Sequence, residues 1–210
     1  MNSVDKLKWR YATKKFDANK KLSNQKIDVL KEVFNLTATS YGLQPIKMLV
    51  ISNQKIKDQL VAASYNQTQV QECSHLLVIC IKTDIDTNYI DSKFDLEKEI
   101  RGTSEEIIGG FRGYLKNQFE NMSNEDIDNA SRKQAYIALG NLMTVCAFEA
   151  IDSCPMEGFQ ADEFDKILEL NKYNLKSALL LPVGYRSEDD HMSTLAKVRF
   201  PLDDSIIEIQ

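Results

Sequence analysis

The side chains of this chain best suited to chemistry are basic residues that gather near its two ends. Two clusters contain them: Arg10, Lys14 and Lys15, and Lys197 with Arg199. In an extended segment Lys197 and Arg199 would project to the same side, because they are two residues apart. Neighbouring aromatic residues can hold such long side chains by cation–π contacts and packing. Composition alone favours two solvated patches, and the alternative is a clamp for a phosphate group.

Glycine-rich phosphate loops are absent from the sequence. The chain has 210 residues with only 8 glycines and 4 prolines, and neither G-x-G-x-x-G nor G-x-x-x-x-G-K-[ST] occurs. A nucleotide phosphate would therefore have to be held by basic side chains.

The chain offers little for nucleophilic or acid–base catalysis. It has no G-x-S-x-G motif, and its two histidines are far apart in the sequence. His75 opens an apolar run and is expected to be a satisfied structural histidine, whereas His191 follows acidic residues and is expected to be solvated. Adjacent acidic residues are interpreted as surface charges at a helix start and in a loop: Glu105 with Glu106, and Asp189 with Asp190. We expect no catalytic side chain and no hydrolysis.

The cysteines are predicted to be buried free thiols. They show no C-x-x-C spacing and lie mostly in apolar runs: Cys73, Cys80, Cys146 and Cys154. Free thiols are typical of the cytoplasm, where we expect the protein to be. With only two histidines in the chain, no zinc or other metal site is expected.

Charge and hydropathy exclude further classes of protein. The 26 basic and 31 acidic residues give a net charge of −5, so no overall basic surface invites nucleic acid. The start, MNSVDKLKWR, has no apolar signal region, and no apolar run reaches the length of a membrane span. We therefore expect neither export nor membrane insertion. The expected ligands are small molecules rather than nucleic acid.

Apolar runs predict the strands of one α+β domain over residues 1–210. Pro182 should place the end of its strand at a gap in the ladder or at an edge. A C-terminal strand at residues 205–209 would need a sheet edge, either its own or a partner's. The other strands are predicted at residues 46–51, 75–81 and 177–183, the second covered on both faces.

Capping residues and periodicity predict the helices. A helix opens at Ser23, and Thr103 with Glu106 forms a capping-box pattern for another. Ser123 opens a long segment that extends through residue 148 and becomes apolar nearly all round. Its second half is therefore expected to be a central, buried helix.

Six stretches of the chain resemble one known family in the same order. The run RYATKKF at residues 10–16 is similar to the R-x-[ST]-x-[KR]-x-[FY] opening of the FMN-dependent nitroreductase/flavin reductase family. Each stretch is weak alone, but their order and spacing are specific, and the resemblance covers essentially the whole chain, thinnest at residues 84–130. The other stretches are SYGLQP at 40–45, NQTQ to SH at 66–75, KQAYIALGN at 133–141, DSCPMEGF at 152–159 and LAKVR at 195–199.

The resemblance implies a nitroreductase-like α+β fold. In that fold a mostly antiparallel central sheet is flanked by helices, with a long central helix among them. It also implies a homodimer that exchanges a C-terminal strand between subunits. FMN would lie at the interface, in sites built from both chains.

The resemblance further implies which residues hold FMN. Arg10, Lys197 and Arg199 would clamp the phosphate, while Lys14 and Asn66 would face the pyrimidine edge of the flavin. Residues 39–42 would come from the other subunit. The whole implied set is Arg10, Tyr11, Ala12, Lys14, Thr39, Ser40, Tyr41, Gly42, Asn66, Gln69, Pro155, Met156, Glu157, Gly158, Lys197 and Arg199.

The loop at residues 155–158 would line the isoalloxazine ring, with the Glu157 backbone N–H near flavin N5. Ordinary structural roles remain open for these residues. Pro155 and Gly158 could simply form a turn, Asn66 could be a helix C-cap, and residues 40–42 could be a plain loop.

Two positions depart from the family pattern. Ala12 stands where serine is frequent, and Gln69 stands where better-known members have a lysine near flavin N1 and O2. A neutral amide stabilises an anionic reduced flavin less than an ammonium does. Phe111 or Tyr114 is expected to cover the flavin and face the substrate, in a stretch where Gly102, Gly109, Gly110 and Gly113 cluster.

The implied activity is that of an FMN-dependent NAD(P)H oxidoreductase. NAD(P)H would reduce the flavin at N5, and nitroaromatics, quinones or flavins would then take two electrons in the same slot. Lys14 and the Glu157 backbone would assist, with no acid–base side chain. The alternatives are a dedicated flavin or dihydropteridine reductase, or a non-enzymatic FMN-storage protein. The sequence leaves open whether NADH or NADPH is preferred.

Overall fold

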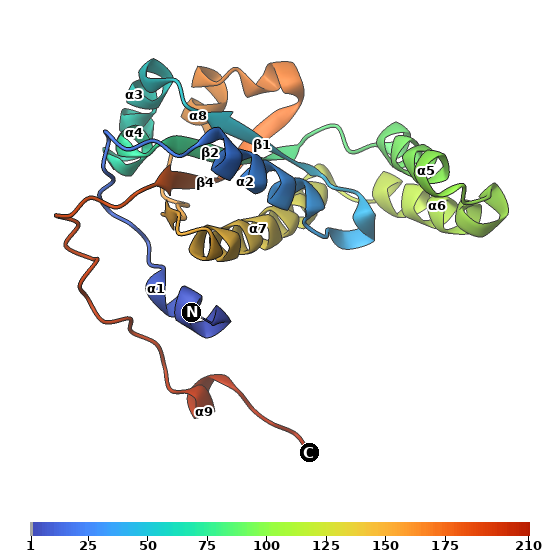
Figure 1. Cartoon of the computed structure of the whole chain (residues 1–210). Helices are drawn as coiled ribbons and strands as arrows, with labels where there is room; N and C mark the ends of the chain where they lie inside the picture. Colours follow the sequence, from blue (N-terminus) through green and yellow to red (C-terminus); the bar gives the residue numbers. More distant parts are fainter. Residues whose placement is uncertain (1) are drawn as a thin grey trace.

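The apolar runs of the sequence form an antiparallel sheet at the centre of the molecule (Figure 1). The computed structural model describes residues 2–210. The strands lie in the order β1-β2-β4-β3, and every neighbouring pair is antiparallel. Three of the strands confirm the predicted internal strands: β1 (Ile46–Ile51), β2 (His75–Lys82) and β4 (Leu175–Gly184). The two-residue strand β3 (Asp152–Ser153) is not among the predicted strands.

Helices cover both faces of this sheet, which explains why β2 is apolar without interruption. Leu77 and Ile79 belong to one core cluster, whereas Leu76 and Val78 belong to the other, because side chains alternate along a strand. The predicted burial of β2 on both faces is confirmed. The first face is covered by α2 (Asn24–Leu36) and α7 (Asn124–Phe148), and the second by α3 (Gln54–Ala63), α4 (Gln69–Glu72) and α8 (Ala161–Ile167).

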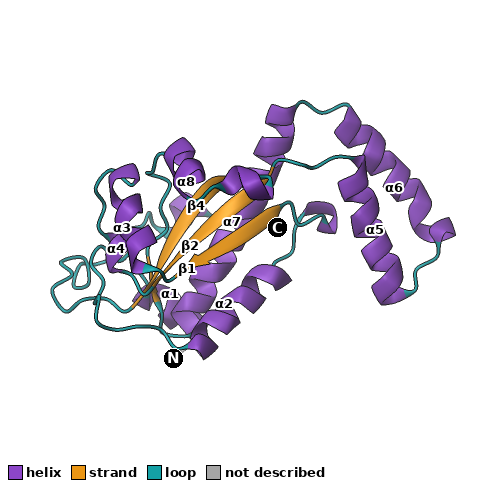
Figure 2. Cartoon of the chain, turned by 90° about the horizontal axis from the view of Figure 1, so that it is seen from above, coloured by secondary structure: helices purple, strands orange, loops and turns teal. Residues whose placement is uncertain are grey.

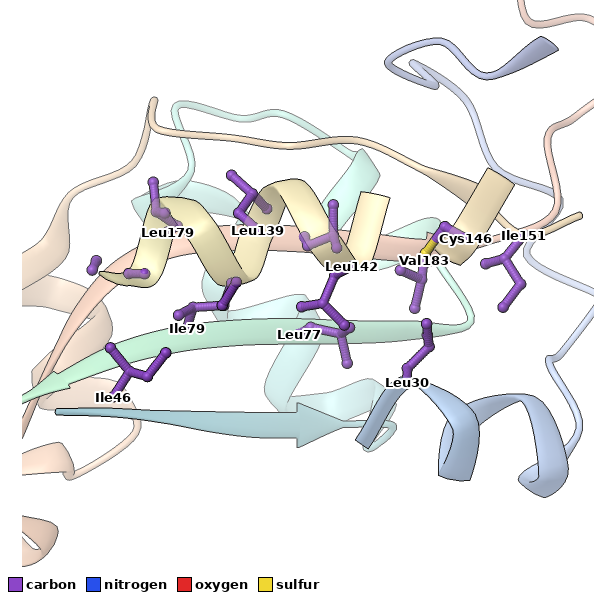
Figure 3. Packing of buried hydrophobic residues seen from close by; sticks show 14 of the residues in the cluster. Leu30, Ile46, Leu77, Ile79, Leu139, Leu142, Cys146, Ile151, Leu179 and Val183 are labelled. Atoms are coloured by element: carbon purple, nitrogen blue, oxygen red, sulfur yellow. The ribbon is translucent and has the colours of Figure 1, made fainter. Parts of the chain in front are cut away.

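The long helix α7 is the central helix that the sequence predicts. Figure 3 shows Leu139, Leu142 and Cys146 of α7 directed at the sheet, where Leu77 and Val183 meet them. Burial of one such leucine contributes about 1.5–3 kcal/mol to folding. Within residues 2–210, no helix combines the length and the apolar character needed to cross a membrane.

Lysines tie the C-terminal end of α7 to two other helices. Lys6 of α1 (Ser3–Trp9) donates from Nζ to the Phe148 carbonyl at 3.0 Å, and Lys26 of α2 donates to the Glu149 carbonyl at 2.6 Å. Positive charge is favourable there, because the carbonyls at a helix C-terminus carry partial negative charge. The Lys6 bond places α1, and hence the residues that follow it, against α7, whereas the Lys26 bond joins α2 to α7.

A helical hairpin formed by α5 (Thr87–Arg101) and α6 (Glu105–Glu120) projects from one end of the sheet (Figure 2). The Arg112 guanidinium of α6 lies 3.8 Å from Asp91 and 3.6 Å from Asp95, both on α5. These ion pairs fasten the two helices across a small apolar core of their own.

The hairpin corrects two details of the sequence analysis. Helix α5 has no counterpart among the predicted helices. Helix α6 begins after Ser104, one residue beyond the predicted start, and its N-cap has no side-chain hydrogen bond, so the Thr103–Glu106 capping box is wrong. Helix α5 ends at Gly102, whose φ of +68° is left-handed, as is common at the C-terminal end of a helix.

The C-terminal strand predicted at residues 205–209 finds no sheet edge within residues 2–210 of its own chain, and its pairing with a partner's sheet stays a prediction. A short helix, α9 (Leu202–Ser205), precedes residues 206–210, which are exposed and pair with no strand among the residues that the structure describes. In Figure 1 this tail runs away from the sheet and reaches none of its edges, so its residues have no described strand to pair with.

Pro182 lies inside β4, where its missing N–H coincides with a gap in the ladder. Its carbonyl accepts from the Cys154 N–H at 3.0 Å, on the side where the two-residue strand β3 has just ended. The nitrogen and carbonyl of a residue in an antiparallel strand face the same neighbouring strand. The Pro182 nitrogen therefore faces the side beyond the end of β3, where no strand among the described residues needs an N–H from this position. The predicted ladder gap is confirmed.

Candidate functional site

The basic run at residues 10–16 crosses the end of the sheet as an extended segment. Arg10 ends α1 with φ −71° and ψ 142°, and Ala12 then forms a parallel bridge with Ser153. The Thr13 N–H donates to the Ser153 carbonyl at 3.2 Å. Phe16 continues the contact through a bridge to Arg186. The segment is therefore fixed against β3 and the end of β4.

One residue of the first basic cluster, Arg10, and both residues of the second meet in one cavity of about 440 Å³, which we call the anion pocket; Lys14 and Lys15 lie outside its lining. Arg10, Lys197 and Arg199 all line it, and no acidic residue does; the remaining lining residues are Lys8, Trp9, Tyr11, Ala12, Met192, Ser193, Leu195, Ala196 and Val198. Lys197 Nζ donates to the Arg10 carbonyl at 2.5 Å. Residues 187 positions apart in sequence thus form one site.

Electrostatics within the anion pocket favour a bound anion. Burial lowers the pKa of Arg10, and repulsion from Arg199 lowers it further. Burial, then Arg10 and Arg199, lowers the pKa of Lys197. The buried Nε of Arg10 has no hydrogen-bond partner, and buried donors are rarely left unsatisfied. A phosphate group would supply both the missing acceptor and the compensating charge.

Asp190 holds the extended segment in place from the opposite loop. Its Oδ2 accepts from the Tyr11 hydroxyl at 2.9 Å, from the Lys14 N–H at 2.9 Å and from the Lys15 N–H at 3.3 Å, and its Oδ1 accepts from the Met192 N–H at 3.0 Å. The residue is only 2% exposed. Burial alone would raise the pKa of this carboxyl, but these hydrogen bonds outweigh burial and hold it below its ordinary value.

The position of Asp190 corrects the sequence analysis, which places both acids of this loop at the surface. The neighbouring Asp189 is indeed exposed and pairs with Lys15. No pattern in the run Glu188-Asp189-Asp190 distinguishes the acid that turns inward. Because Asp190 binds the Tyr11 hydroxyl, that hydroxyl is already engaged within the chain.

The loop at residues 154–158 lies next to the same segment. Lys14 Nζ is 4.0 Å from the Cys154 Sγ. Met156 pairs through both backbone groups with Leu180, and its side chain is buried in the core, so neither its backbone nor its side chain is free for a ligand. Pro155 is half-buried, and Glu157 is exposed.

The end of α3 joins this loop from a third part of the chain. Gln67 Nε2 donates to the Gly158 carbonyl at 2.8 Å. Asn66 has φ +59° and donates its N–H to the Val61 carbonyl at 3.0 Å, which is the bond of a helix C-terminal turn. Its backbone thus fills the ordinary structural role, while its side chain stays exposed. Gln69, at the start of α4, is buried.

The remaining predicted residues lie in a separate group around the hairpin. The Ser40 N–H donates to Gln134 Oε1 at 2.9 Å. The ring of Tyr41 meets Phe111 edge-on at 6.0 Å, and Phe111 stacks on Tyr114 at 6.2 Å. Gly42 lies beside Lys93. Thr39 precedes this turn, and its Oγ1 accepts a hydrogen bond from the backbone N–H of Gln44, which follows the turn. Within residues 2–210, none of these aromatic residues lines the anion pocket.

His75 and the cysteines have structural roles and His191 is exposed, as the sequence analysis expects. His75 Nδ1 lies 2.9 Å from the Ser74 hydroxyl, and burial lowers the pKa of this histidine; His191 is exposed. The cysteines are free and buried, and burial raises the pKa of Cys73, Cys80 and Cys146 to about 12. Such thiols are inert, which confirms their predicted role.

The fold and the anion pocket define an α+β protein that can hold a phosphate with basic side chains. The chain belongs to the nitroreductase family, because residues 7–185 match the model of that family. The family resemblance noted in the sequence is thereby confirmed.

Relatives and solved structures agree with this assignment. A protein of Staphylococcus saprophyticus with the provisional name NAD(P)H nitroreductase is 33% identical over 195 residues, covering 89% of each chain. The structure of a provisionally named nitroreductase of Bacillus subtilis, ydfN, covers 98% of each chain with a TM-score of 0.86 and 16% identity. A provisionally named nitroreductase of Exiguobacterium sibiricum, solved in complex with FMN, has a TM-score of 0.82 and 21% identity over 100% of this chain and 98% of its own. The fold of this chain is therefore the nitroreductase fold.

The hydrogen bonds of Asp190 make a pH-dependent prediction. Its pKa is lowered by folding, so the carboxylate stabilises the fold above the unfolded-state pKa, and this contribution is lost as pH falls through the folded-state pKa. Asp190→Asn should therefore cost about 2 kcal/mol at neutral pH, because an amide cannot accept all of these bonds. The measurement is urea unfolding at pH 7 and then in steps down to acid.

The matched control is Asp189→Asn, which changes the exposed neighbour and should have little effect at any pH. The gap between wild type and Asp190→Asn should close as the pH falls. A gap that is already absent at neutral pH would show that Asp190 does not hold the segment.

Proposed function

We propose that this protein is an FMN-dependent NAD(P)H oxidoreductase of the nitroreductase type. The observation that carries the proposal is the anion pocket, where Arg10, Lys197 and Arg199 face one another without a carboxylate and Arg10 Nε lacks a partner. Family membership supports FMN as the phosphate-bearing ligand, as does the FMN complex of the Exiguobacterium sibiricum relative. The name of the Staphylococcus saprophyticus relative supports NAD(P)H as the electron donor.

In this proposal the anion pocket binds the phosphate, and the neighbouring segments bind the ring. Lys14 and Asn66 face the pyrimidine edge, and the loop at residues 155–158 lies along the ring with the Glu157 N–H free to donate toward N5. Bound FMN would supply two-electron redox chemistry between NAD(P)H and an acceptor such as a nitroaromatic, a quinone or a free flavin. One slot for donor and acceptor gives ping-pong kinetics.

The protein's own task is then positioning and charge compensation. Lys14 brings an ammonium to this edge, next to the buried thiol of Cys154. Gln69 is buried and uncharged, so it offers an anionic reduced ring a dipole rather than a charge. His75 is engaged by Ser74 and His191 is exposed, which leaves proton transfer to solvent or substrate.

We also propose a homodimer in which the tail of each chain lies on the other. Ile207 is 88% exposed and Ile209 is 94% exposed, an unfavourable arrangement for a lone chain. Strand β1 has a free edge, and a cavity of about 650 Å³ beside it is lined by Lys31, Lys47 and Lys82 among others. The tail carries opposite charge, in Asp203, Asp204 and Glu208.

A dimer of this kind would complete the site. The aromatic group around Tyr41, Phe111 and Tyr114 is half exposed and far in sequence from the anion pocket, and it can cover a flavin held by the partner. The four free thiols fit a reducing compartment, so we place the enzyme in the cytoplasm.

The proposed activity predicts the behaviour of the reconstituted protein. Protein incubated with FMN and desalted should remain yellow, and anaerobic addition of NADH or NADPH should bleach the visible flavin band. Subsequent addition of nitrofurazone or a quinone should restore the band, because the same slot serves both half-reactions. The titrations are followed by stopped-flow absorbance, and the faster nucleotide is the preferred donor. A protein that stays colourless after reconstitution refutes the proposal.

The phosphate clamp predicts a loss of FMN affinity in Arg199→Ala. Removal of one charge-assisted partner should weaken FMN binding by about 1.5–3 kcal/mol, read from a fluorescence titration. Lys176→Ala is the matched control, since that lysine pairs with Asp128 outside the pocket. Equal affinity in Arg199→Ala and the control would make Arg199 a solvated surface charge.

The exchanged tail predicts that a chain ending at residue 205 dimerises more weakly. Loss of the three isoleucines at 206, 207 and 209 should raise the dimer dissociation constant at least about tenfold, measured by sedimentation velocity over a dilution series. Ser205→Ala in the full chain is the control, because it leaves the apolar tail intact. A truncated chain with the wild-type dissociation constant would show that the tail is not part of the interface.

A further inference from the structure

Arg186 makes an unusual set of contacts just after β4. Its guanidinium lies 4.4 Å from the centre of the Trp9 ring and 4.5 Å from the centre of the Tyr11 ring. The same group binds Asp152, with Nε donating to Oδ1 at 2.7 Å, and the Arg186 backbone N–H donates to Oδ2 at 2.8 Å. Asp152 is only 6% exposed. One side chain thus joins two aromatic rings and a buried carboxylate.

The two rings flank Arg10 in the sequence. Trp9 and Tyr11 contact Arg186, whereas the Arg10 guanidinium faces Arg199 in the anion pocket. Fixing both neighbours of an extended residue fixes the direction in which its own side chain leaves the backbone. Arg186 therefore acts on the orientation of Arg10 while lying outside the lining of the pocket.

The other partner of Arg186 leads to the second half of the site. Asp152 opens β3, whose second residue, Ser153, accepts the Thr13 N–H at 3.2 Å. The chain then continues into the loop at residues 154–158. The ion pair between Arg186 and Asp152 consequently sets the spacing between the basic segment and this loop.

Arginine is the residue type that these contacts demand. A planar guanidinium can bind a carboxylate through its edge while its faces contact aromatic rings, and a lysine ammonium cannot do both. A buried ion pair contributes little to stability on balance, so retention of this pair is better explained by the geometry that it imposes.

We propose that Arg186 is a positioning residue that aims Arg10 at the FMN phosphate without touching the cofactor. This inference rests on the proposed function, because it takes FMN to be the ligand of the anion pocket. It makes a distinctive claim: loss of Arg186 should weaken recognition of the phosphate and leave recognition of the flavin ring largely unchanged.

The test compares FMN with riboflavin, which has the same ring and no phosphate. Dissociation constants of both are measured by flavin fluorescence quenching for wild type, Arg186→Met and the control Lys26→Met, which removes a different cation–π contact, 5.4 Å from the Tyr185 ring. In Arg186→Met the FMN constant should rise at least about tenfold and the riboflavin constant by less than about twofold. The control should change neither.

A second variant protects the test against a loss of folding in Arg186→Met. Trp9→Leu removes one stacking face and keeps the ion pair with Asp152, and it should raise the FMN constant about three- to tenfold, with riboflavin again unaffected. Circular dichroism and thermal unfolding establish that each variant is folded. Inorganic phosphate gives an independent reading, because it should compete with FMN less effectively in the folded variants than in wild type.

The outcomes separate this inference from the proposed function. A wild type that binds no FMN, or binds FMN and riboflavin equally, refutes the FMN phosphate site itself. A wild type that prefers FMN, together with folded variants whose two constants rise by the same factor or not at all, refutes the positioning role of Arg186 and leaves the proposed function intact.

Discussion

Two buried carboxylates hold the segment on which the whole candidate site depends. Asp190 gathers backbone and phenol donors from residues 11–15, and Asp152 binds the arginine that stacks on Trp9 and Tyr11. A carboxylate removed from water is costly unless its acceptors are satisfied, so each of these groups accepts only one arrangement of its partners. The segment consequently has a defined path over the end of the sheet, and the basic side chains that it carries have defined directions.

The anion pocket shows the opposite situation, and the contrast explains how it works. Arg10, Lys197 and Arg199 repel one another, and one buried donor has no partner. Such an arrangement is unfavourable by itself and persists because the surrounding structure imposes it. The satisfied carboxylates thus hold unsatisfied cations in place, and in the proposed function these cations would supply the binding energy for an anionic ligand. The satisfied carboxylates on one side of the segment are therefore what allow the uncompensated cations on its other side to persist.

The sequence predicted the parts of this fold that periodic burial determines. The runs at β2 and β4 and the apolar half of α7 are buried by the sheet core, so their patterns were sufficient. Helix α5 was missed because only Ile90 and Phe94 are buried along it, which leaves little periodic pattern. The strand at residues 205–209 has the right composition, but composition does not supply a sheet edge. Asp190 could not be found either, because its burial depends on donors from residues more than a hundred positions away.

The C-terminal segment has two roles in the proposed homodimer. Residues 195–199 place Lys197 and Arg199 against Arg10, and the chain then leaves the body of the molecule toward its exposed isoleucines. In the proposed dimer this one segment closes the phosphate site of its own chain and binds the partner. Whatever orders its first part reduces the entropy cost of ordering its second part. Binding of the cofactor and association of the subunits are then linked, each strengthening the other by the same factor. If both proposals hold, the hydrogen bonds of Asp190 and the stacking of Arg186, which hold the segment that carries Arg10, would support subunit association as well as phosphate binding.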